Sequence, residues 1–323
     1  MMAVTLKTIN TDRILRRMAG VCAVTINYNN ARDTARCVAS LCASSASADV
    51  FVVDNSPNDP QLDPKLTPYS GVTTIYPETN IGFGAGNNLG VAQALNVSSY
   101  DYILLLNNDA TIGSEDIEQL LDAADKHPAA GIIAPRIVLD ENQDVLWYGG
   151  GEVDWFRAAA VVPGFFGPAD SELAKKSRWV TFASGCAMLF RRSVWEELNG
   201  FDPRFFMYEE DLEICLRAIE SGWKIWYESG ALVKHRGQGS FRVGGSEFQT
   251  RLDYENESLP FFAYHIFRNR VLNVRLHAKG YCYLCAMVGL PLFFVKKGLL
   301  FAIHRRFRAI QSMIKGVVAG ILT

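Results

Sequence analysis

Short apolar runs alternate with stretches of helical spacing along the first third of the chain. These runs, the first of them rich in β-branched residues, predict strands at residues 21–28, 50–53, 72–76 and 102–106. Residues 32–42 and 86–95 carry apolar side chains at helical spacing. Strands that alternate with helices in this way form an open, mostly parallel sheet with helices on both faces. We therefore expect an α/β fold.

The pattern becomes less regular in the second half. Residues 140–178 are rich in glycine and aromatic residues with no sustained period, which predicts a long excursion shaped for a partner. Regular structure is expected again at 179–182, with helices over 193–198 and 210–221 and short strands at 224–227 and 231–234. We find no internal repeat.

The last part of the chain is apolar and helical in character. Residues 281–295 form an apolar run, followed by Lys296-Lys297 and a second apolar stretch over 298–303. Fifteen apolar residues fall short of the roughly 20 that span a bilayer. The run therefore predicts an amphipathic segment that lies on a membrane surface, and a core helix packed on the domain is the alternative.

Composition and charge refine this picture. With 323 residues, 49% of them hydrophobic, the chain can bury the core of one large domain plus an appendage. The net charge of −2 argues against nucleic-acid binding. No acidic residue follows Glu257, whereas ten basic residues do, which leaves 22 of the 32 basic residues against 34 acidic residues in 1–257. An acidic body thus carries a basic tail that suits anionic headgroups.

The cysteines and the N-terminus indicate where the protein resides. Seven cysteines, an odd number scattered among apolar neighbours, are typical of reduced thiols in a reducing compartment. Cys282-x-x-Cys285 lacks a second pair of ligands at zinc spacing. Before Gly20 the chain has basic residues but no apolar run that resembles a signal-peptide core. We expect a cytoplasmic protein.

Polar residues follow two of the predicted strands. Asn107-Asn108-Asp109 comes directly after a strand, where a carboxylate beside two amides can ligate a divalent cation that bridges nucleotide phosphates. Asp54 ends another strand, where its carboxylate can accept the ring N–H of uracil or thymine. Turn formation, before Pro57 in the case of Asp54, is the alternative for both. Ligands of open α/β sheets bind at these strand ends.

A glycine-rich motif covers residues 80–88, where glycines let the backbone approach a ligand closely. It differs from the dinucleotide-binding fingerprint, because the third glycine is missing in both registers: Asn87 and Leu89 stand in its place. This spacing argues against a nicotinamide-dependent oxidoreductase.

An acidic segment begins the helix predicted over 210–221. Glu210 and Asp211 lie at its start, where the helix dipole favours a carboxylate. A carboxylate beside aromatic residues such as Tyr208 is a candidate general base, and a helix cap with ordinary surface pairs is the alternative. His235 follows a strand and is either a metal ligand or a loop histidine.

Taken in order, these motifs resemble glycosyltransferase family 2, and within it the rhamnosyltransferase-like branch of bacterial surface-polysaccharide enzymes. The resemblance covers residues 21–275. The motifs that carry it are Val24-Thr-Ile-Asn-Tyr28, Val53-Asp-Asn-Ser56, Asn80-x-Gly-Phe-Gly-x-Gly-Asn-Asn88, Leu105-Leu-Asn-Asn-Asp109, Ser184-Gly-Cys186, Phe190-Arg191, Gly200-Phe-Asp202, Phe205-Phe-Met-Tyr-x-Glu-Asp211, Val233-x-His235 and Gly239-Ser240.

The resemblance implies a GT-A fold, which is Rossmann-like with a mostly parallel central sheet and helices on both faces. It divides the chain into an N-terminal extension (1–20), a GT-A domain (21–260) and a basic, apolar, membrane-associating helical tail (261–323). It further implies Mg²⁺ or Mn²⁺ and inversion at the anomeric carbon. The best match to the donor is dTDP-rhamnose, with a UDP-hexose or UDP-galactofuranose as alternatives. The acceptor would be a lipid-linked saccharide or a polysaccharide, at the inner face of the plasma membrane.

The resemblance also assigns roles to residues. Asp211, with Glu210 beside it, would be the base, and Asp109 and His235 would hold the metal. The acceptor side would include Trp155, Tyr208 and Arg217. From their glycine and aromatic content we interpret residues 148–167 as an acceptor-side lid, and core packing of their aromatic side chains is the alternative. The donor nucleotide would be bound by Thr25, Asn27, Asp54, Asn80, Gly82, Asn87, Asn88, Asn107 and Asn108.

Two departures from the family pattern and two rival functions bear on this assignment. The usual Asp-x-Asp begins here with Asn107, and Glu213 stands where the family has a second Asp. A non-catalytic sugar-nucleotide binder or scaffold would have lost the base or the metal carboxylate, and both are present. A nucleotidyltransferase would need a glycine-rich, basic loop near the N-terminus, where residues 25–35 offer only Arg32.

Overall fold

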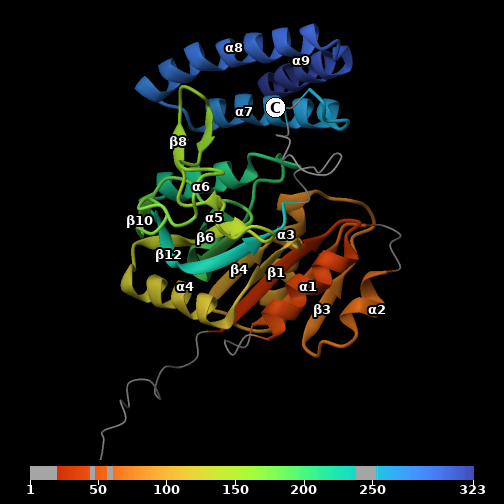
Figure 1. The fold of residues 1–323 in the computed structure, drawn as a ribbon, viewed down its shortest axis with the longest axis vertical. Helices are drawn as coiled ribbons and strands as arrows, with labels where there is room; N and C mark the ends of the chain where they lie inside the picture. The colour runs from red at the N-terminus through yellow and green to blue at the C-terminus, as the bar shows by residue number, and fades with distance from the viewer. Residues whose placement is uncertain (1–19, 44–47, 57–60, 238–251, 253) are drawn as a thin grey trace, which may run out of the picture.

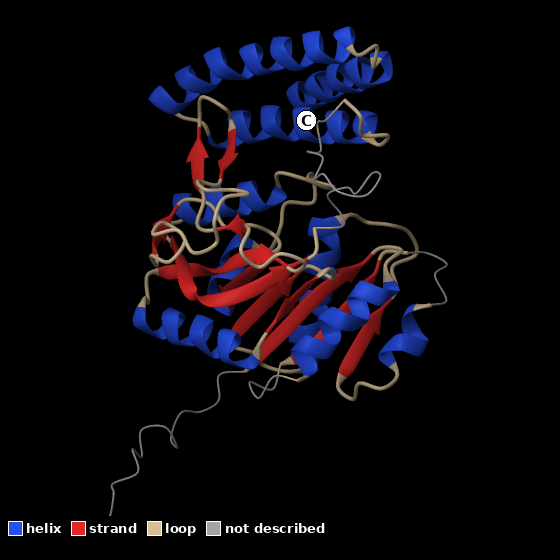
Figure 2. Cartoon of the chain, in the orientation of Figure 1, coloured by secondary structure: helices blue, strands red, loops and turns tan. Residues whose placement is uncertain are grey.

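The computed structural model describes residues 20–43, 48–56, 61–237, 252 and 254–323. An α/β body carries three helices stacked on one side of it (Figure 1), and the central sheet runs through the body with helices on both faces (Figure 2). The predicted N-terminal extension, apart from Gly20, lies outside the described residues, as do Pro57 and Gly239-Ser240.

The first half of the sheet is parallel, as the alternation of strands and helices predicts. Its strands pair in the order β3-β2-β1-β4, and almost every residue of β1, β2 and β4 is buried. The elements of this half are β1 (Val21–Asn27), α1 (Ala31–Cys42), β2 (Asp49–Asp54), α2 (Leu62–Leu66), β3 (Val72–Ile75), α3 (Phe83–Val97) and β4 (Tyr102–Leu106). The parallel register places the ends of β1 and β2 side by side, with Asn27 opposite Asp54.

The second half is mixed, because β11 runs antiparallel to both neighbours, β4 and β6. The order continues β4-β11-β6-β12-β10, with β5 beside β12 and β7 beside β6. The elements of this half are β5 (Ala110–Ile112), α4 (Ser114–Lys126), β6 (Ala130–Leu139), β7 (Leu146–Tyr148), β10 (Arg178–Val180), β11 (Ala187–Arg191), α5 (Arg192–Leu198), α6 (Glu210–Glu220) and β12 (Lys224–His235).

One strand, β12, replaces the two short strands predicted at 224–227 and 231–234. Its pairing with β6 shifts register between Glu228 and Leu232, next to Pro135 of β6. Proline has no N–H to donate to a ladder, so a bulge at this point is the expected accommodation. The two predicted strands are therefore the two sides of a bulge.

The glycine-rich excursion is more ordered than its sequence indicates. It contains a hairpin of β8 (Glu152–Asp154) and β9 (Ala159–Val161) that reaches up to the tail helices (Figure 1). A Cβ on Gly289 of the tail would lie 1.6 Å from the carbonyl oxygen of Phe156, so the hairpin turn meets the tail backbone directly. Docking on the tail leaves this hairpin little freedom to act as the lid predicted for 148–167.

The tail consists of α7 (Leu259–His277), α8 (Gly280–Ile303) and α9 (Phe307–Leu322). Gly316 and Gly320 of α9 face the carbonyl oxygens of Tyr264 and Arg268 of α7, at 2.3 and 2.5 Å from where a Cβ would stand. Glycines spaced by four residues let two helix backbones approach closely. The two helices therefore pack as a tight parallel pair, and α8 lies along them (Figure 1).

The helix that contains the apolar run of the tail is longer than the run itself. Helix α8 has 24 residues and continues through Lys296-Lys297. Within the described part of the chain it is the one helix long and apolar enough to cross a membrane, by length and composition alone. Only 22% of its most apolar stretch is buried, so it is not a core helix.

Candidate active site

The ends of β1, β2 and β4 are tied together by buried side chains. The Asn27 Nδ2 donates a hydrogen bond to Asp54 Oδ1 at 2.8 Å. Thr34 Oγ1, on α1, donates to Asn27 Oδ1 at 2.7 Å and accepts from Asn108 Nδ2 at 2.9 Å. Asn27, Thr34 and Asp54 are at most 3% exposed. This network fixes the loops after three strands relative to one another.

A cavity of about 580 Å³ lies over these strand ends. It brings together eight of the predicted site residues from segments far apart in sequence: Asn80, Asn107, Asn108, Asp109, Tyr208, Glu210, Asp211 and His235. The loops after the parallel strands supply one wall, and the start of α6 with the end of β12 supplies the other. Strand ends are where open α/β sheets bind ligands.

Asp109 and His235 form the candidate metal pair. His235 Nε2 lies 3.1 Å from Asp109 Oδ1, and both side chains are at least 92% buried. Burial lowers the pKa of His235, but Cys186 and Asp109 beside it raise that pKa well above its usual value. Asp109 and His235 would offer a carboxylate oxygen and, once the histidine has lost its proton, an imidazole nitrogen to Mg²⁺ or Mn²⁺.

The pair would not hold a metal by itself. The described residues include no group of three or more His, Cys, Asp and Glu side chains placed to hold an ion. Mg²⁺ commonly binds through one or two carboxylates, substrate phosphates and waters. A two-residue site at the edge of a cavity is thus consistent with a metal held jointly by the protein and a diphosphate.

The start of α6 presents two carboxylates to the cavity. Asp211 Oδ2 accepts a hydrogen bond from the Gly185 backbone N–H at 3.1 Å, and its Oδ1 accepts from the Leu212 N–H at 2.9 Å. Glu210, the preceding residue, is 7% exposed. Backbone donors and the helix N-terminus both favour an ionised carboxylate. Asp211 is therefore held in place in a form that can accept a proton.

The glycine motif of residues 80–88 packs against residues 206–211, the acidic segment that carries Glu210 and Asp211. Gly82 has a φ of +85°, and a Cβ there would lie 2.2 Å from the carbonyl oxygen of Phe206. The same carbonyl accepts a hydrogen bond from the Phe83 N–H at 3.0 Å. Only glycine fits this position, so the motif predicted to bind donor also packs against the segment that carries Asp211.

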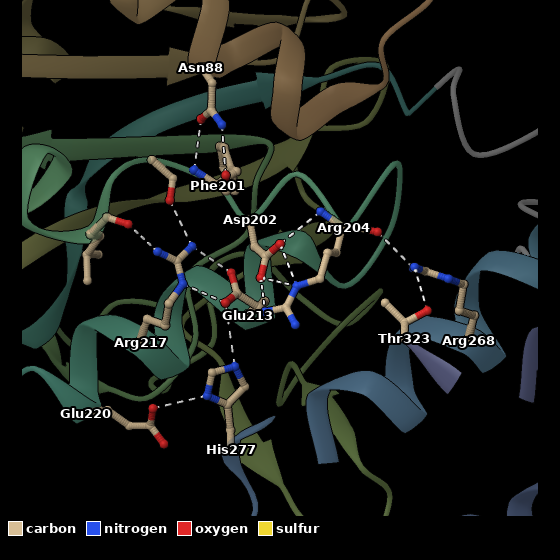
Figure 3. Close-up of polar contacts among 12 residues, drawn as sticks. Asn88, Phe201, Asp202, Arg204, Glu213, Arg217, Glu220, Arg268, His277 and Thr323 are labelled. Atoms are coloured by element: carbon tan, nitrogen blue, oxygen red, sulfur yellow. Dashed lines mark hydrogen bonds and ion pairs between the residues drawn. The ribbon is translucent and has the colours of Figure 1, made fainter. Parts of the chain in front are cut away.

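Several predicted donor residues support the site without lining it. Asn88 exchanges two 2.8 Å hydrogen bonds with the backbone of Phe201 (Figure 3). Asn87 is buried and donates to the Phe83 carbonyl at 3.0 Å. Thr25 is fully buried inside β1. Thr25, Asn27, Asp54, Gly82, Asn87 and Asn88 are absent from the cavity lining.

Two residues predicted on the acceptor side lie elsewhere. Arg217 forms a two-pronged ion pair with Glu213, at 2.6 and 2.7 Å, and donates to the Gly200 carbonyl at 2.8 Å (Figure 3). A helix places residues four apart on one face, which turns Arg217 toward Glu213 rather than toward the cavity. Trp155 is partly buried against the core. Neither residue lines this cavity.

Sequence analysis missed several lining residues, among them Trp147 and Asn55. The Trp147 ring meets the His235 ring edge-on, 4.7 Å between centroids, and contacts the half-exposed rings of Phe165 and Phe166. No spacing rule indicated Trp147. Asn55 donates to the Gly82 carbonyl at 2.9 Å, while its buried Oδ1 has no hydrogen-bond partner among the described residues. Its position directly after Asp54 was the available signal.

A cavity lined by carboxylates and amides at the carboxyl ends of parallel strands is typical of α/β proteins that bind a polar ligand at this edge of the sheet. Residues 22–198 match the family model for glycosyl transferase family 2, which is more than half of the chain. The chain belongs to this family and is a glycosyltransferase.

Known proteins agree with this assignment. The N-acetylglucosaminyl-diphospho-decaprenol L-rhamnosyltransferase of Mycobacterium tuberculosis is 28% identical over 229 residues, or 66% of this chain and 74% of that protein. The structure of GalNAc-T7 with UDP, GalNAc and Mn²⁺ superposes with a TM-score of 0.59 at 17% identity. It covers 82% of this chain, which spans 49% of that structure.

A third likeness covers nearly the whole molecule. The mannosyltransferase PcManGT of Pyrobaculum calidifontis, solved with GDP-Man and Mn²⁺, has a TM-score of 0.54 at 11% identity and covers 94% of this chain and 87% of its own. At these identities the solved structures show the fold alone. The fold is GT-A-like, as the sequence motifs predicted.

Proposed function

We propose that the protein is an inverting, metal-dependent transferase that moves a sugar from a nucleotide-diphosphate donor to a lipid-linked saccharide or a polysaccharide. The observation that carries the proposal is the meeting of Asp109 and His235 with Glu210 and Asp211 in one cavity. We favour dTDP-rhamnose as donor, in line with the name of the mycobacterial relative, and a UDP-hexose or UDP-galactofuranose is the alternative.

The donor base is proposed to lie near the ends of β1 and β2. Within the part of the chain that the structure describes, Asn55 Oδ1 is a buried acceptor without a partner, in a residue that lines the cavity. A buried acceptor left unpaired is costly, and the ring N–H of uracil or thymine would satisfy it. Asp54, directly before it and fixed by Asn27, supports this wall.

The diphosphate is proposed to lie by Asp109 and His235, with Asn107 and Asn108 beside it. When bound there, Mg²⁺ or Mn²⁺ would neutralise charge on the leaving diphosphate. The solved structures of GalNAc-T7 and PcManGT both contain Mn²⁺ with their nucleotide ligands.

Asp211 is the proposed general base. Its carboxylate accepts the proton of the acceptor hydroxyl while that oxygen forms a bond to the anomeric carbon. The bond from that carbon to the diphosphate oxygen breaks on the opposite face, which inverts the configuration and releases the nucleoside diphosphate. Glu210, directly before it, lines the same cavity.

The acceptor is proposed to lie against aromatic side chains of the cavity. Tyr208 and Trp147 line it, with Phe165 and Phe166 packed on Trp147 at the surface. Trp155 and Arg217, which the resemblance places on the acceptor side, lie outside the cavity lining. Aromatic walls with few polar groups are typical of sites that orient small ligands.

The tail is proposed to bind the membrane that carries a lipid-linked acceptor, at the inner face of the plasma membrane. Exposed apolar side chains follow one another at helical spacing along α8: Tyr281, Leu284, Val288, Leu292, Val295, Leu299 and Ile303. Helix α9 exposes Phe307, Ile314, Val318 and Ile321 in the same way. The chain after Glu257 is basic without acidic residues, which suits anionic headgroups.

Thermal unfolding with nucleoside diphosphates tests the donor site. We expect dTDP or UDP to stabilise the protein in the presence of Mn²⁺, by about 2.7 kcal/mol at a concentration of about one hundred times Kd. Asp109→Ala should abolish the metal-dependent part, because it removes the one carboxylate of the metal pair. Asp144→Ala, at an exposed aspartate outside the cavity, is the matched control. If no nucleoside diphosphate shifts the transition under any metal, the proposal fails.

A further inference from the structure

Helix α7 of the tail lies against the backbone of the acidic segment. Asn269 Nδ2 donates hydrogen bonds to the carbonyl oxygens of Met207 at 3.0 Å and Tyr208 at 2.7 Å. Asn273 Nδ2 donates to the carbonyl oxygen of Glu209 at 3.3 Å. Asn269 is fully buried and Asn273 is 2% exposed. Two side-chain amides therefore bind three successive carbonyls directly before Glu210 and Asp211.

The same face of α7 makes further contacts with this segment. The rings of Phe262 and Tyr208 pack 5.3 Å apart, and those of His265 and Phe206 stack at 5.4 Å. Residues 262, 265, 269 and 273 recur at helical spacing, so they form one stripe along the helix. From the flank of this stripe, Arg270 pairs with Glu209, 2.9 Å between Nε and Oε1. Together these contacts extend over about three turns of α7.

The conformation of the segment explains why such contacts are needed. Tyr208 has a φ of +68° and Glu209 a φ of +65°, in the left-handed region that residues other than glycine rarely adopt. Two such residues in succession persist only where surrounding groups fix them. On the side away from α7, the Phe83 N–H of α3 donates a hydrogen bond to the Phe206 carbonyl. Contacts from α3 and α7 thus surround the left-handed turn.

We propose that Asn269 and Asn273 are positioning residues of the active site, which hold the left-handed turn and thereby aim Asp211 into the cavity. They lie outside residues 22–198, the part that matches the family model. The tail is thus a structural part of the catalytic site as well as a membrane attachment. The inference rests on the proposed role of Asp211 as base.

Asn269→Leu in the full chain is the direct test, because leucine keeps the volume and removes the donors. We expect amide hydrogen exchange in residues 207–212 to become at least about tenfold faster. We expect kcat with dTDP-rhamnose or a UDP-hexose to fall at least about tenfold, because small displacements of a catalytic group are costly. Binding of dTDP or UDP with Mn²⁺, measured by calorimetry, should stay within about threefold, since the strand ends are unchanged.

Arg275→Met is the matched control. Arg275 lies on the same helix and donates to a backbone carbonyl, that of Gly320, at 2.7 Å, but it touches α9 and not the acidic segment. It should leave kcat and exchange in 207–212 unchanged. Asn269→Gln retains the amide and should restore part of the activity lost in Asn269→Leu.

Each outcome decides the matter. A folded Asn269→Leu with the kcat and exchange of the control overturns the proposal, as does exchange that rises equally throughout the tail. If Asn269→Leu does not fold, Asn273→Leu, which removes a single hydrogen bond, is judged by the same criteria. If wild type binds no nucleotide, the proposed function fails, and exchange in 207–212 still tests the positioning by itself.

Discussion

At the scale of single residues, Asn27 connects the end of β2 with α1 and, through α1, with the loop after β4. Its amide binds Asp54 on one side and Thr34 on the other, and Thr34 in turn binds Asn108. Sequence analysis assigned Asn27 to the nucleotide, whereas its full burial makes it a brace for the residues that line the cavity.

Asn27→Leu should lower the free energy of unfolding by about 1–3 kcal/mol, because it leaves Asp54 buried with one donor fewer. Urea unfolding followed by circular dichroism measures the change. Asn96→Leu, at an exposed asparagine near the end of α3, is the control and should change stability by less than about 0.5 kcal/mol. Equal effects of the two variants would show that the network does not brace the strand ends.

The site residues that sequence predicts well are those that directly follow a strand. Asn107, Asn108 and Asp109 were found in this way, because a strand and its end are local features. Trp147 and Arg217 show the limit of such reasoning. Whether their side chains face the cavity depends on packing against His235 and on pairing with Glu213, and spacing along the chain does not encode either contact.

At the scale of elements, the sequence predicts the strands of the parallel half of the sheet well, and it predicts the strands of the mixed half less completely. Continuous apolar runs identify β1, β2 and β4, which are buried on both faces. Strand β6 contains Gly131 and Pro135, both poor strand residues, and was missed. Strand β11 is short and gains its place by pairing with two distant strands. Such pairing is a tertiary effect.

Helix α7 carries a titratable contact that makes its docking sensitive to pH. Burial and, to a smaller extent, the nearby Arg268 together lower the pKa of His265 to about 4. In the unfolded chain the pKa of histidine is about 6.5. Between these two values the unfolded state binds more protons, so stability is lost as pH falls from about 6.5 toward about 4.

His265→Phe should remove this part of the pH dependence while retaining the stacking on Phe206. The measurement is the midpoint of thermal unfolding at several pH values, compared between variant and wild type. The curve of the variant should be flatter across the window from about 6.5 to about 4. His304→Phe, at an exposed histidine of the tail, is the control. A wild-type curve parallel to that of His265→Phe would contradict the assignment.

At the scale of the whole molecule, the tail packs on the body beside the active site, and we propose that its exposed face binds the membrane. Helix α7 touches the body from Phe262, beside Tyr208, to His277, which lies 3.1 Å from Glu220. Helix α8 packs along it, with the Phe293 ring 5.3 Å from that of Phe267. A membrane-spanning α8 would draw the basic α7 and the body into the bilayer. The arrangement therefore favours an α8 that lies in the interface, although its length alone would permit it to cross.

Vesicle flotation tests this arrangement. Replacing Leu284, Val288 and Leu292 together by glutamine should weaken binding to vesicles of anionic phospholipid at least about tenfold, because each exposed side chain is expected to bury apolar area worth about 1 kcal/mol or more in the interface. Raising the salt concentration should weaken wild-type binding further, since the basic residues of the tail act through screened charges.

The matched control replaces exposed apolar residues of the body, Val97, Leu173 and Ile219, by glutamine, and it should bind vesicles as wild type does. Equal binding by both triple variants would show that the tail is not the attachment.

Extraction at alkaline pH separates the two ways in which α8 can associate with lipid. A helix that lies in the interface should be released with the body, because it has no segment enclosed by hydrocarbon on all sides. Retention in the vesicles would require α8 to separate from α7 when it binds the membrane. The membrane would then act on α7 directly and, because α7 holds the acidic segment, on the conformation of that segment.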